Sequence, residues 1–287
     1  MNELGVSNIV VPAAGPPGPA LRGYAARELA GAIEGLGRRG GGIHGGVHRA
    51  RKSLRRVRAV LALCGSGPGP GAELLDRELR RANRRLSRLR DAQALVEVLD
   101  RLIRKAESSD SSELLRRARR AAARARAEQA RLERDLDPGF HDTRALLGTL
   151  QAALPALQWT SVTEAQVAAS LQSSTTRLAR ASARARSTGR DRDWHRWRRR
   201  ARRLSQQRRA LGDVAAQSAV IQRGDKAVAE WLGDAQDFAL LHDHCGRRSV
   251  FTGADRRTLR ALAEHGRRRL RERVAQAEAE SPAPVAG

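Results

Sequence analysis

Lysine, aromatic residues and cysteine are all scarce in this sequence of 287 residues. Only three of its 55 basic residues are lysines (Lys52, Lys105 and Lys226), so 52 are arginines. Aromatic residues make up 3% of the chain, which leaves Ala and Leu as the main apolar residues and favours helices over sheets. The two cysteines, Cys64 and Cys245, lie far apart and match no metal or redox spacing, which argues against a disulfide framework. We therefore expect an all-α protein in a reducing, cytoplasmic setting.

Long apolar runs are absent as well. No stretch approaches the length of a membrane span, and the first residues lack the basic start and apolar core of a signal peptide. We therefore expect no membrane partner.

The residue patterns of common active sites are also missing. No Ser-His-Asp set or pair of catalytic carboxylates stands out, and the glycine run at 65–71 lacks the Lys-Ser or Lys-Thr of a phosphate-binding loop. The sequence HDHC at 242–245 places three candidate ligands within four residues of one helix, so they cannot all face one ion. We expect neither an enzyme nor a metal or other cofactor.

Positive charge is what the sequence has in excess. A net charge of +24 would make the folded surface repel itself unless a polyanion neutralised it. The planar fork of arginine can grip two phosphate oxygens at once, so phosphate is the natural ligand class.

Apolar residues recur at three- and four-residue spacing in nine successive segments, as in helices with one buried face. We expect helices at about 24–38, 46–64, 72–106, 111–136, 141–153, 163–187, 193–214, 225–245 and 255–279. The breaks between them carry Gly, Pro and Ser, for example at 40–42, 65–71, 138–139 and 188–189. Residues 1–21 and 281–287 lack this periodicity, and we expect them to be disordered.

The chain contains an internal repeat. HRARKSLRRVR from His48 is echoed 147 residues later by HRWRRRARRLSQQRR from His195. LSRLRDAQAL, from residue 86, resembles LGDAQDFALL, from residue 232, and pairs Asp91 with Asp237 at a spacing of 146. The literal DAQ match of Asp91 with Asp234 gives 143 instead and breaks the leucine register. Either alignment implies a duplication.

Each copy of the repeat forms a helix with one basic and one apolar side. In the first copy the apolar side holds Val47, Ala50, Leu54, Val57, Leu61 and Cys64. In the second it holds Trp194, Trp197, Ala201 and Leu204. On the opposite sides, like charges stack at three- and four-residue spacing and repel, each pair by a few tenths of a kcal/mol (about 0.2–0.5). Such faces predict an anionic ligand.

The helix pattern HxxR(K/R)xx(R/K)(R/K)x(R), present twice and each time followed by a leucine-rich helix carrying (R/Q)D, resembles the CHAD family, the conserved-histidine α-helical domains. The resemblance covers about residues 22–280, with halves at about 22–153 and 160–280. It implies two pseudo-symmetric four-helix bundles whose basic helices line a central groove or pore that binds inorganic polyphosphate. The ExExK signature of a CYTH triphosphatase domain is absent, so the chain resembles a stand-alone CHAD protein. Polyphosphate granules are the location that the resemblance suggests.

Carried over residue by residue, the resemblance assigns polyphosphate binding to eleven positions. They are His48, Arg51, Lys52, Arg55, Arg56 and Arg58 in the first copy, and His195, Arg198, Arg199, Arg202 and Arg203 in the second. Ser205 stands where the first copy has Arg58, so we expect an asymmetric site. A phosphate that raised the pKa of either histidine would bind more strongly as the pH falls.

A nucleic-acid-binding protein is the main alternative, because basicity alone suits DNA or RNA. The basic faces lack interleaved aromatic residues on which bases could stack. An enzyme of phosphate transfer would need a carboxylate cluster for a metal, and a membrane-surface protein would need large apolar residues beside the basic stripe. Neither feature is evident, so polyphosphate is the preferred ligand.

Overall fold

The computed structural model describes residues 16–106, 108–214, 223–246 and 249–280. These residues form ten α-helices and four short 3₁₀ turns, with no strand among them, which confirms the all-α expectation. The α-helices are α1 (Pro17–Leu36), α2 (Ile43–Leu63), α3 (Gly71–Arg85), α4 (Ser87–Arg104), α5 (Ser109–Leu136), α6 (His141–Ala153), α7 (Glu164–Thr188), α8 (Asp191–Val214), α9 (Arg223–His244) and α10 (Gly253–Glu280). The 3₁₀ turns are η1 (Gly40–Gly42), η2 (Pro138–Phe140), η3 (Leu154–Ala156) and η4 (Trp159–Ser161).

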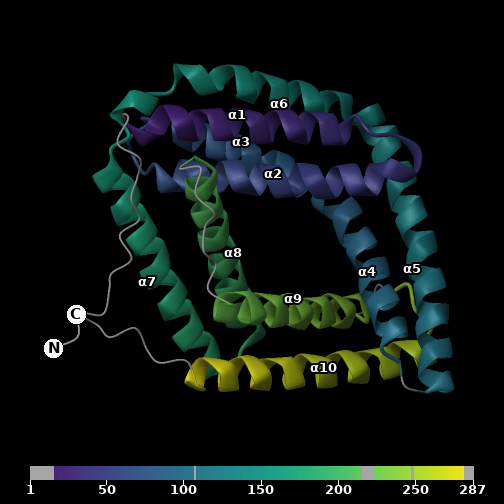
Figure 1. Ribbon diagram of the computed structural model, residues 1–287. Coiled ribbons are helices and arrows are strands. Elements are labelled where there is room, and N and C mark those ends of the chain that lie inside the picture. Colours follow the sequence, from purple (N-terminus) through teal and green to yellow (C-terminus); the bar gives the residue numbers. More distant parts are fainter. Residues whose placement is uncertain (1–15, 107, 215–222, 247–248, 281–287) are drawn as a thin grey trace.

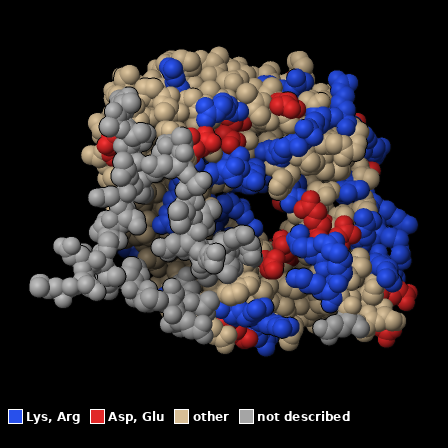
Figure 2. Space-filling view, in the orientation of Figure 1, with Lys and Arg blue, Asp and Glu red and all other residues tan. Residues whose placement is uncertain are grey.

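Figure 1 shows the helices arranged as a four-sided frame. The pairs α1/α2, α4/α5, α7/α8 and α9/α10 form the sides, and α3 and α6 pack with α1 and α2. Helices α2, α4, α8 and α9 lie on the inner side of the frame. The space-filling view retains an opening at the centre, bordered by basic side chains and on one side by acidic ones (Figure 2).

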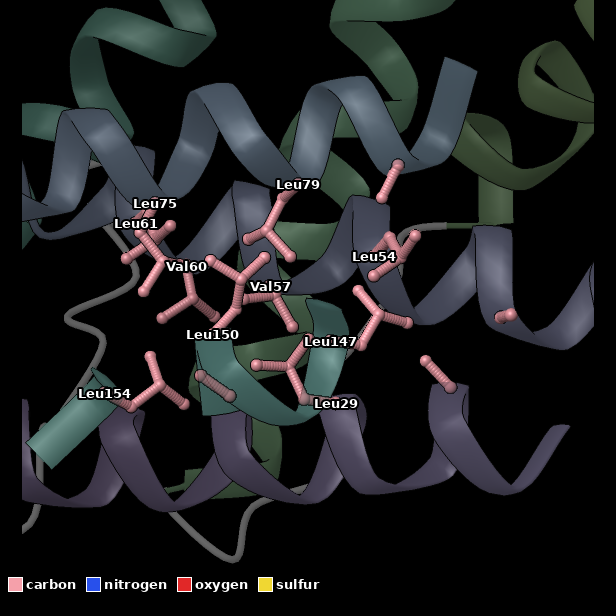
Figure 3. Packing of buried hydrophobic residues seen from close by; sticks show 14 of the residues in the cluster. Leu29, Leu54, Val57, Val60, Leu61, Leu75, Leu79, Leu147, Leu150 and Leu154 are labelled. Atoms are coloured by element: carbon pink, nitrogen blue, oxygen red, sulfur yellow. The ribbon is translucent and has the colours of Figure 1, made fainter. Parts of the chain in front are cut away.

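Apolar packing is divided among three clusters that lie along the sides and at the corners of the frame. The first joins α1, α2, α3 and α6, where Leu29, Leu54, Leu79 and Leu147 interdigitate (Figure 3). The second joins α4 and α5 to α9 and α10, and the third joins α7 and α8 to α9 and α10. Each helix therefore buries one stripe against its neighbours and leaves another facing solvent or the opening.

Several helix ends follow the expected signals. Thr163 and Gln166 form a capping box at the start of α7, in which each side chain accepts a hydrogen bond from the other residue's backbone N–H. Gly189 ends the same helix in the left-handed conformation, with φ of 61°, which glycine adopts without a steric penalty. Ser108 caps α5 by accepting a hydrogen bond from the backbone N–H of Ser111.

Helix α1 begins earlier than the sequence suggested. Helix α1 starts at Pro17, inside the stretch of 1–21 that was expected to be disordered, whereas residues 1–15 lie outside the described part, as do residues 281–287. Proline suits the first helical position because its missing N–H would have no partner there. Leu21 is fully buried, and Gly18 lies so close to the backbone of Trp159 that a Cβ atom would clash. Tertiary packing, absent from the periodicity, orders this segment.

The single long helix expected at 72–106 is wrong. The chain forms α3 and α4 instead, with the break at Leu86 and a hydrogen bond of 2.6 Å from the Ser87 hydroxyl to the carbonyl of Arg84. No Gly or Pro marks this turn, and Leu86 is buried, so the apolar pattern continues through the break. The periodicity could not reveal it.

Candidate functional site

The basic sides of α2 and α8, two helices on the inner side of the frame, come together. Burial, followed by the charges of Arg202, Arg51, Arg198 and Arg90, lowers the pKa of Arg55 to about 9. Burial and the charge of Arg202 lower the pKa of Arg198 to about 10. These five arginines are named the central cluster; they come from α2, α4 and α8.

Three members of the central cluster lack a carboxylate partner. Arg55, Arg198 and Arg202 form no ion pair with the described residues, whereas Arg90 pairs with Glu97 at 2.8 Å. Arg51 donates a hydrogen bond of 2.6 Å to the backbone carbonyl of Asn83. The Nε atoms of Arg51 and Arg55 are buried without a hydrogen-bond partner in the described chain. Because buried, unpaired cations are unfavourable, this arrangement favours an anion.

Two carboxylates flank the central cluster. Burial raises the pKa of Asp91, although the charge of Arg51 opposes the rise. Burial likewise raises the pKa of Asp237, which forms an ion pair with Arg101 of α4. The charge of Asp237 also favours the charged forms of Arg198 and Arg202 on α8. With Glu97 included, five arginines face three carboxylates, which leaves the site with excess positive charge.

The two repeated histidines occupy equivalent places. His48 on α2 lies near Arg90, and burial followed by the charge of Arg90 lowers its pKa. The Nδ1 atom of His195 on α8 lies 2.9 Å from the Oε1 atom of Gln236. Both side chains are exposed, which leaves them accessible to a ligand.

Other predicted residues lie away from the central cluster. Arg56 forms an ion pair of 2.7 Å with Glu28 of α1, and both side chains are only 14% exposed. Arg58 binds Asp76 of α3 with two hydrogen bonds, of 2.8 and 3.2 Å. The structure therefore places both arginines in contacts that join α2 to its neighbours.

The remaining three predicted residues are Lys52, Arg203 and Arg199, and their surroundings differ. Partial burial, followed by the charges of Arg56 and Arg209, lowers the pKa of Lys52. Burial, followed by the charge of Arg58, lowers the pKa of Arg203. Arg199 is exposed and lines a pocket with His195. Lys52 therefore lies beside the central cluster, whereas Arg203 lies on the side of Arg58.

Sequence reasoning missed Arg90 as a member of the cluster. The signal was present, because Arg90 belongs to the repeated (R/Q)D element and corresponds to Gln236 at the spacing of 146. The structure agrees with that spacing, since Arg90 neighbours His48 and Gln236 neighbours His195. The charge of Asp91 opposes the lowering of the pKa of Arg51, and the charge of Asp237 does the same for Arg198. The alternative spacing of 143 does not produce these equivalences.

Two cavities differ in their chemistry. One, of about 410 Å³, lies between α8, α9 and α10 and is lined largely by arginines, among them Arg198 and Arg199. A larger one, of about 860 Å³, lies between α4, α5, α9 and α10, and its surface is mostly apolar, with Leu102, Phe238 and Leu262 among its lining residues. Only the smaller cavity shares a residue with the central cluster.

Within the described residues, no three metal-binding side chains gather at one point. His242 contacts Glu264 at 3.2 Å, whereas His244 lies near Asp91 and Cys245 is buried in the second apolar cluster. Across the same part of the chain, every helix is too short or too polar to cross a membrane.

The chain is thus an all-α protein in which arginines of α2, α4 and α8 converge. The model of the CHAD domain matches residues 25–246, and the chain belongs to the CHAD family. This domain is a non-catalytic binding domain associated with polyphosphate. The match ends before α10, although α10 packs along α9.

The solved structure of PptA from Streptomyces chartreusis, also a CHAD protein, is similar to this chain. The TM-score is 0.67 at 19% sequence identity, and the alignment covers 93% of this chain and 100% of PptA. This likeness concerns the fold. No curated protein matches the chain.

Proposed function

We propose that this protein binds inorganic polyphosphate at the central cluster and does not transform it. The observation that carries the proposal is the group of arginines, Arg55, Arg198 and Arg202, that converge without carboxylate partners in the described chain. An anionic chain would relieve their mutual repulsion and supply the missing hydrogen-bond acceptors. The association of the family with polyphosphate supports the same ligand.

The proposal extends to the arrangement of the binding residues. Two pseudo-symmetric halves, at about 22–153 and 160–280, would each contribute one basic helix to a shared central groove. Besides the central cluster, His48, Lys52, Arg199 and His195 would contact the chain, with Arg203 beside them. Arg56 and Arg58 would act indirectly, since ion pairs already hold both.

Nucleic acid is the second candidate because the same positive charge would attract it. Base readout usually needs aromatic platforms, yet Trp194 and Trp197 of the basic helix α8 are only 8% and 2% exposed. Their indole rings pack against each other, with centroids 5.1 Å apart. A chain made only of phosphates fits this surface better than a base-bearing one.

A competition titration tests the ligand class. Long-chain polyphosphate would be titrated against single- and double-stranded nucleic acid at matched phosphate concentration and fixed, near-physiological salt. We expect strong preference for polyphosphate. Equal or tighter binding of nucleic acid would overturn the proposal, and shortening of the polyphosphate during incubation with Mg²⁺ would overturn its non-catalytic part.

A charge-matched pair of variants tests the site. Replacing Arg51, Arg55, Arg198 and Arg202 together by Ala should weaken polyphosphate binding by about a hundredfold or more, because several charge-assisted hydrogen bonds are lost. The control replaces four exposed arginines on α3 and α5 that have no ion pair within the described chain: Arg80, Arg116, Arg120 and Arg124. Both variants lose the same charge, so similar affinities for the two would refute the assignment. Circular dichroism would verify that both remain helical.

We also propose where the protein lies in the cell. A cytoplasmic protein with this specificity would gather on polyphosphate granules. A fluorescent fusion of the wild type should colocalise with the granules, whereas the fusion of the central-cluster variant should be diffuse.

A further inference from the structure

The two halves of the repeat differ at one corner of the frame. In the first half, three side chains of α4 fill the space beside His48: Arg90 pairs with Glu97 at 2.8 Å, and Gln93 donates to Glu97 at 3.1 Å. Arg126 of α5 donates to Gln93 at 3.0 Å. This hydrogen-bonded chain crosses the corner from α4 to α5.

The corresponding residues of α9 are all shorter. At the spacing of 146, three residues of α9 correspond to Arg90, Gln93 and Glu97 of α4. They are, in the same order, Gln236, Ala239 and Asp243. All three line the pocket of about 410 Å³ beside His195. The pocket therefore occupies the place that the longer side chains fill in the first half.

The lining of this pocket is strongly cationic. Six arginines and His195 face two carboxylates, those of Asp191 and Asp243. Asp191 is already bound by Arg267 and, at 2.8 Å, by Arg271. Arg198 and Arg199 have no carboxylate within ion-pair distance in the described chain. Since Arg198 also belongs to the central cluster, the pocket adjoins the proposed polyphosphate path.

Packed side chains form one wall of the pocket. The Arg271 guanidinium lies over the Trp194 ring, 5.1 Å from its centroid, and its ion pair with Asp191 ties α10 to the start of α8. The Nε1 atom of Trp194 and the Nε atom of Arg271 are buried donors without a partner in the described residues.

We infer that this pocket is an end-binding subsite for condensed phosphate, present in the second half and filled in the first. It would hold pyrophosphate or the terminal units of a longer chain. A terminal phosphate carries up to about two negative charges near neutral pH and more free oxygens than an internal unit, which suits the excess of arginine. The inference rests on the proposed function for its class of ligand, and it fixes where one end of a bound chain would lie.

Exchanging the corner residues between the halves tests this subsite. The closing variant, Gln236→Arg/Ala239→Gln/Asp243→Glu, copies the first half and adds one positive charge. The opening variant, Arg90→Gln/Gln93→Ala/Glu97→Asp, copies the second half and removes one. A generic charge effect and a pocket effect therefore predict opposite signs for pyrophosphate binding.

Isothermal titration with pyrophosphate at fixed salt and pH gives the readout. The closing variant should bind pyrophosphate about tenfold more weakly than the wild type, the loss expected for one charge-assisted contact. The opening variant should bind one additional pyrophosphate. Affinity of the closing variant for long-chain polyphosphate should stay within about threefold, because its main contacts lie outside the pocket.

Unchanged or tighter pyrophosphate binding by the closing variant would overturn the inference. If the triple variant failed to fold, the pyrophosphate affinity of Ala239→Gln alone would test the inference, since this substitution fills the pocket without changing the charge. Failure of the proposed function is separate, because it would appear in the wild type as a lack of preference for polyphosphate over nucleic acid.

Discussion

At the scale of single residues, Arg55 shows how the proposed function conflicts with stability. Burial and four neighbouring arginines lower its pKa to about 9, so its charged form is disfavoured in the folded protein. Solvent screening reduces the penalty to about 1–2 kcal/mol. We predict that Arg55→Met raises the melting temperature by about 3 °C or more while weakening polyphosphate binding.

The pH dependence of this effect has a definite sign. Because the pKa of Arg55 is lowered to about 9 in the folded protein, the penalty on its charged form is full below that pH and fades as the pH rises. The stabilisation by Arg55→Met should shrink above pH 9 in thermal melts. Arg49→Met, at an exposed position of the same helix, should leave the melting temperature nearly unchanged; equal shifts for both variants would contradict this account.

His48 should make polyphosphate binding depend on pH. Burial and the charge of Arg90 keep its pKa below the usual value, so the free imidazole is neutral at pH 7.5. A bound polyanion favours the protonated form, so affinity should rise about two- to fivefold between pH 7.5 and 5.5. Titrations at constant ionic strength should show a smaller rise in affinity for His48→Gln than for the wild type. An identical rise in the two proteins would exclude His48 as the source of the pH dependence.

At the scale of elements, the position of the basic helix α2 depends on its close approach to α1. Gly46 of α2 lies against the backbone of Gly35, and an added Cβ would fall 2.0 Å from the Gly35 carbonyl oxygen. We predict that Gly46→Ala lowers the free energy of unfolding by about 1–3 kcal/mol through overpacking. Its neighbour Gly45 has open space, so Gly45→Ala should raise stability by up to about 1 kcal/mol. Denaturant melts of both variants would test the helix contact.

At the scale of the whole molecule, basic side chains border a central opening, and apolar clusters lie along the sides of the frame (Figure 2). Ion pairs help to join the halves: Arg101 binds Asp237, and Arg117 binds Asp255 at 2.9 Å. A polyanion spanning the basic helices of both halves should therefore stabilise the entire fold.

Thermal melts measure this linkage. Long-chain polyphosphate at a hundred times its dissociation constant should stabilise the protein by about 2.7 kcal/mol. Orthophosphate at equal phosphate concentration and ionic strength should stabilise it less, because its units bind independently. The variant with four alanines in the central cluster should lose the polyphosphate effect; an undiminished shift would place the ligand elsewhere.

The sequence by itself determined the features that depend on neighbouring residues. Helical periodicity, the Gly stop at 189 and the two basic helices follow from spacing and local propensity. The repeat placed four arginines on equivalent helix faces: Arg51, Arg55, Arg198 and Arg202. The resemblance to CHAD proteins predicted that these two faces form one site.

Only the tertiary structure decided features that depend on contacts between distant segments. Leu21 orders the start of α1, and Leu86 turns the chain without a Gly or Pro signal. Glu28 and Asp76 form ion pairs with Arg56 and Arg58, two residues predicted to bind polyphosphate, because α1 and α3 pack beside α2. Spacing along one helix reveals which residues share a face, whereas the carboxylates that meet that face come from helices whose positions are fixed by packing.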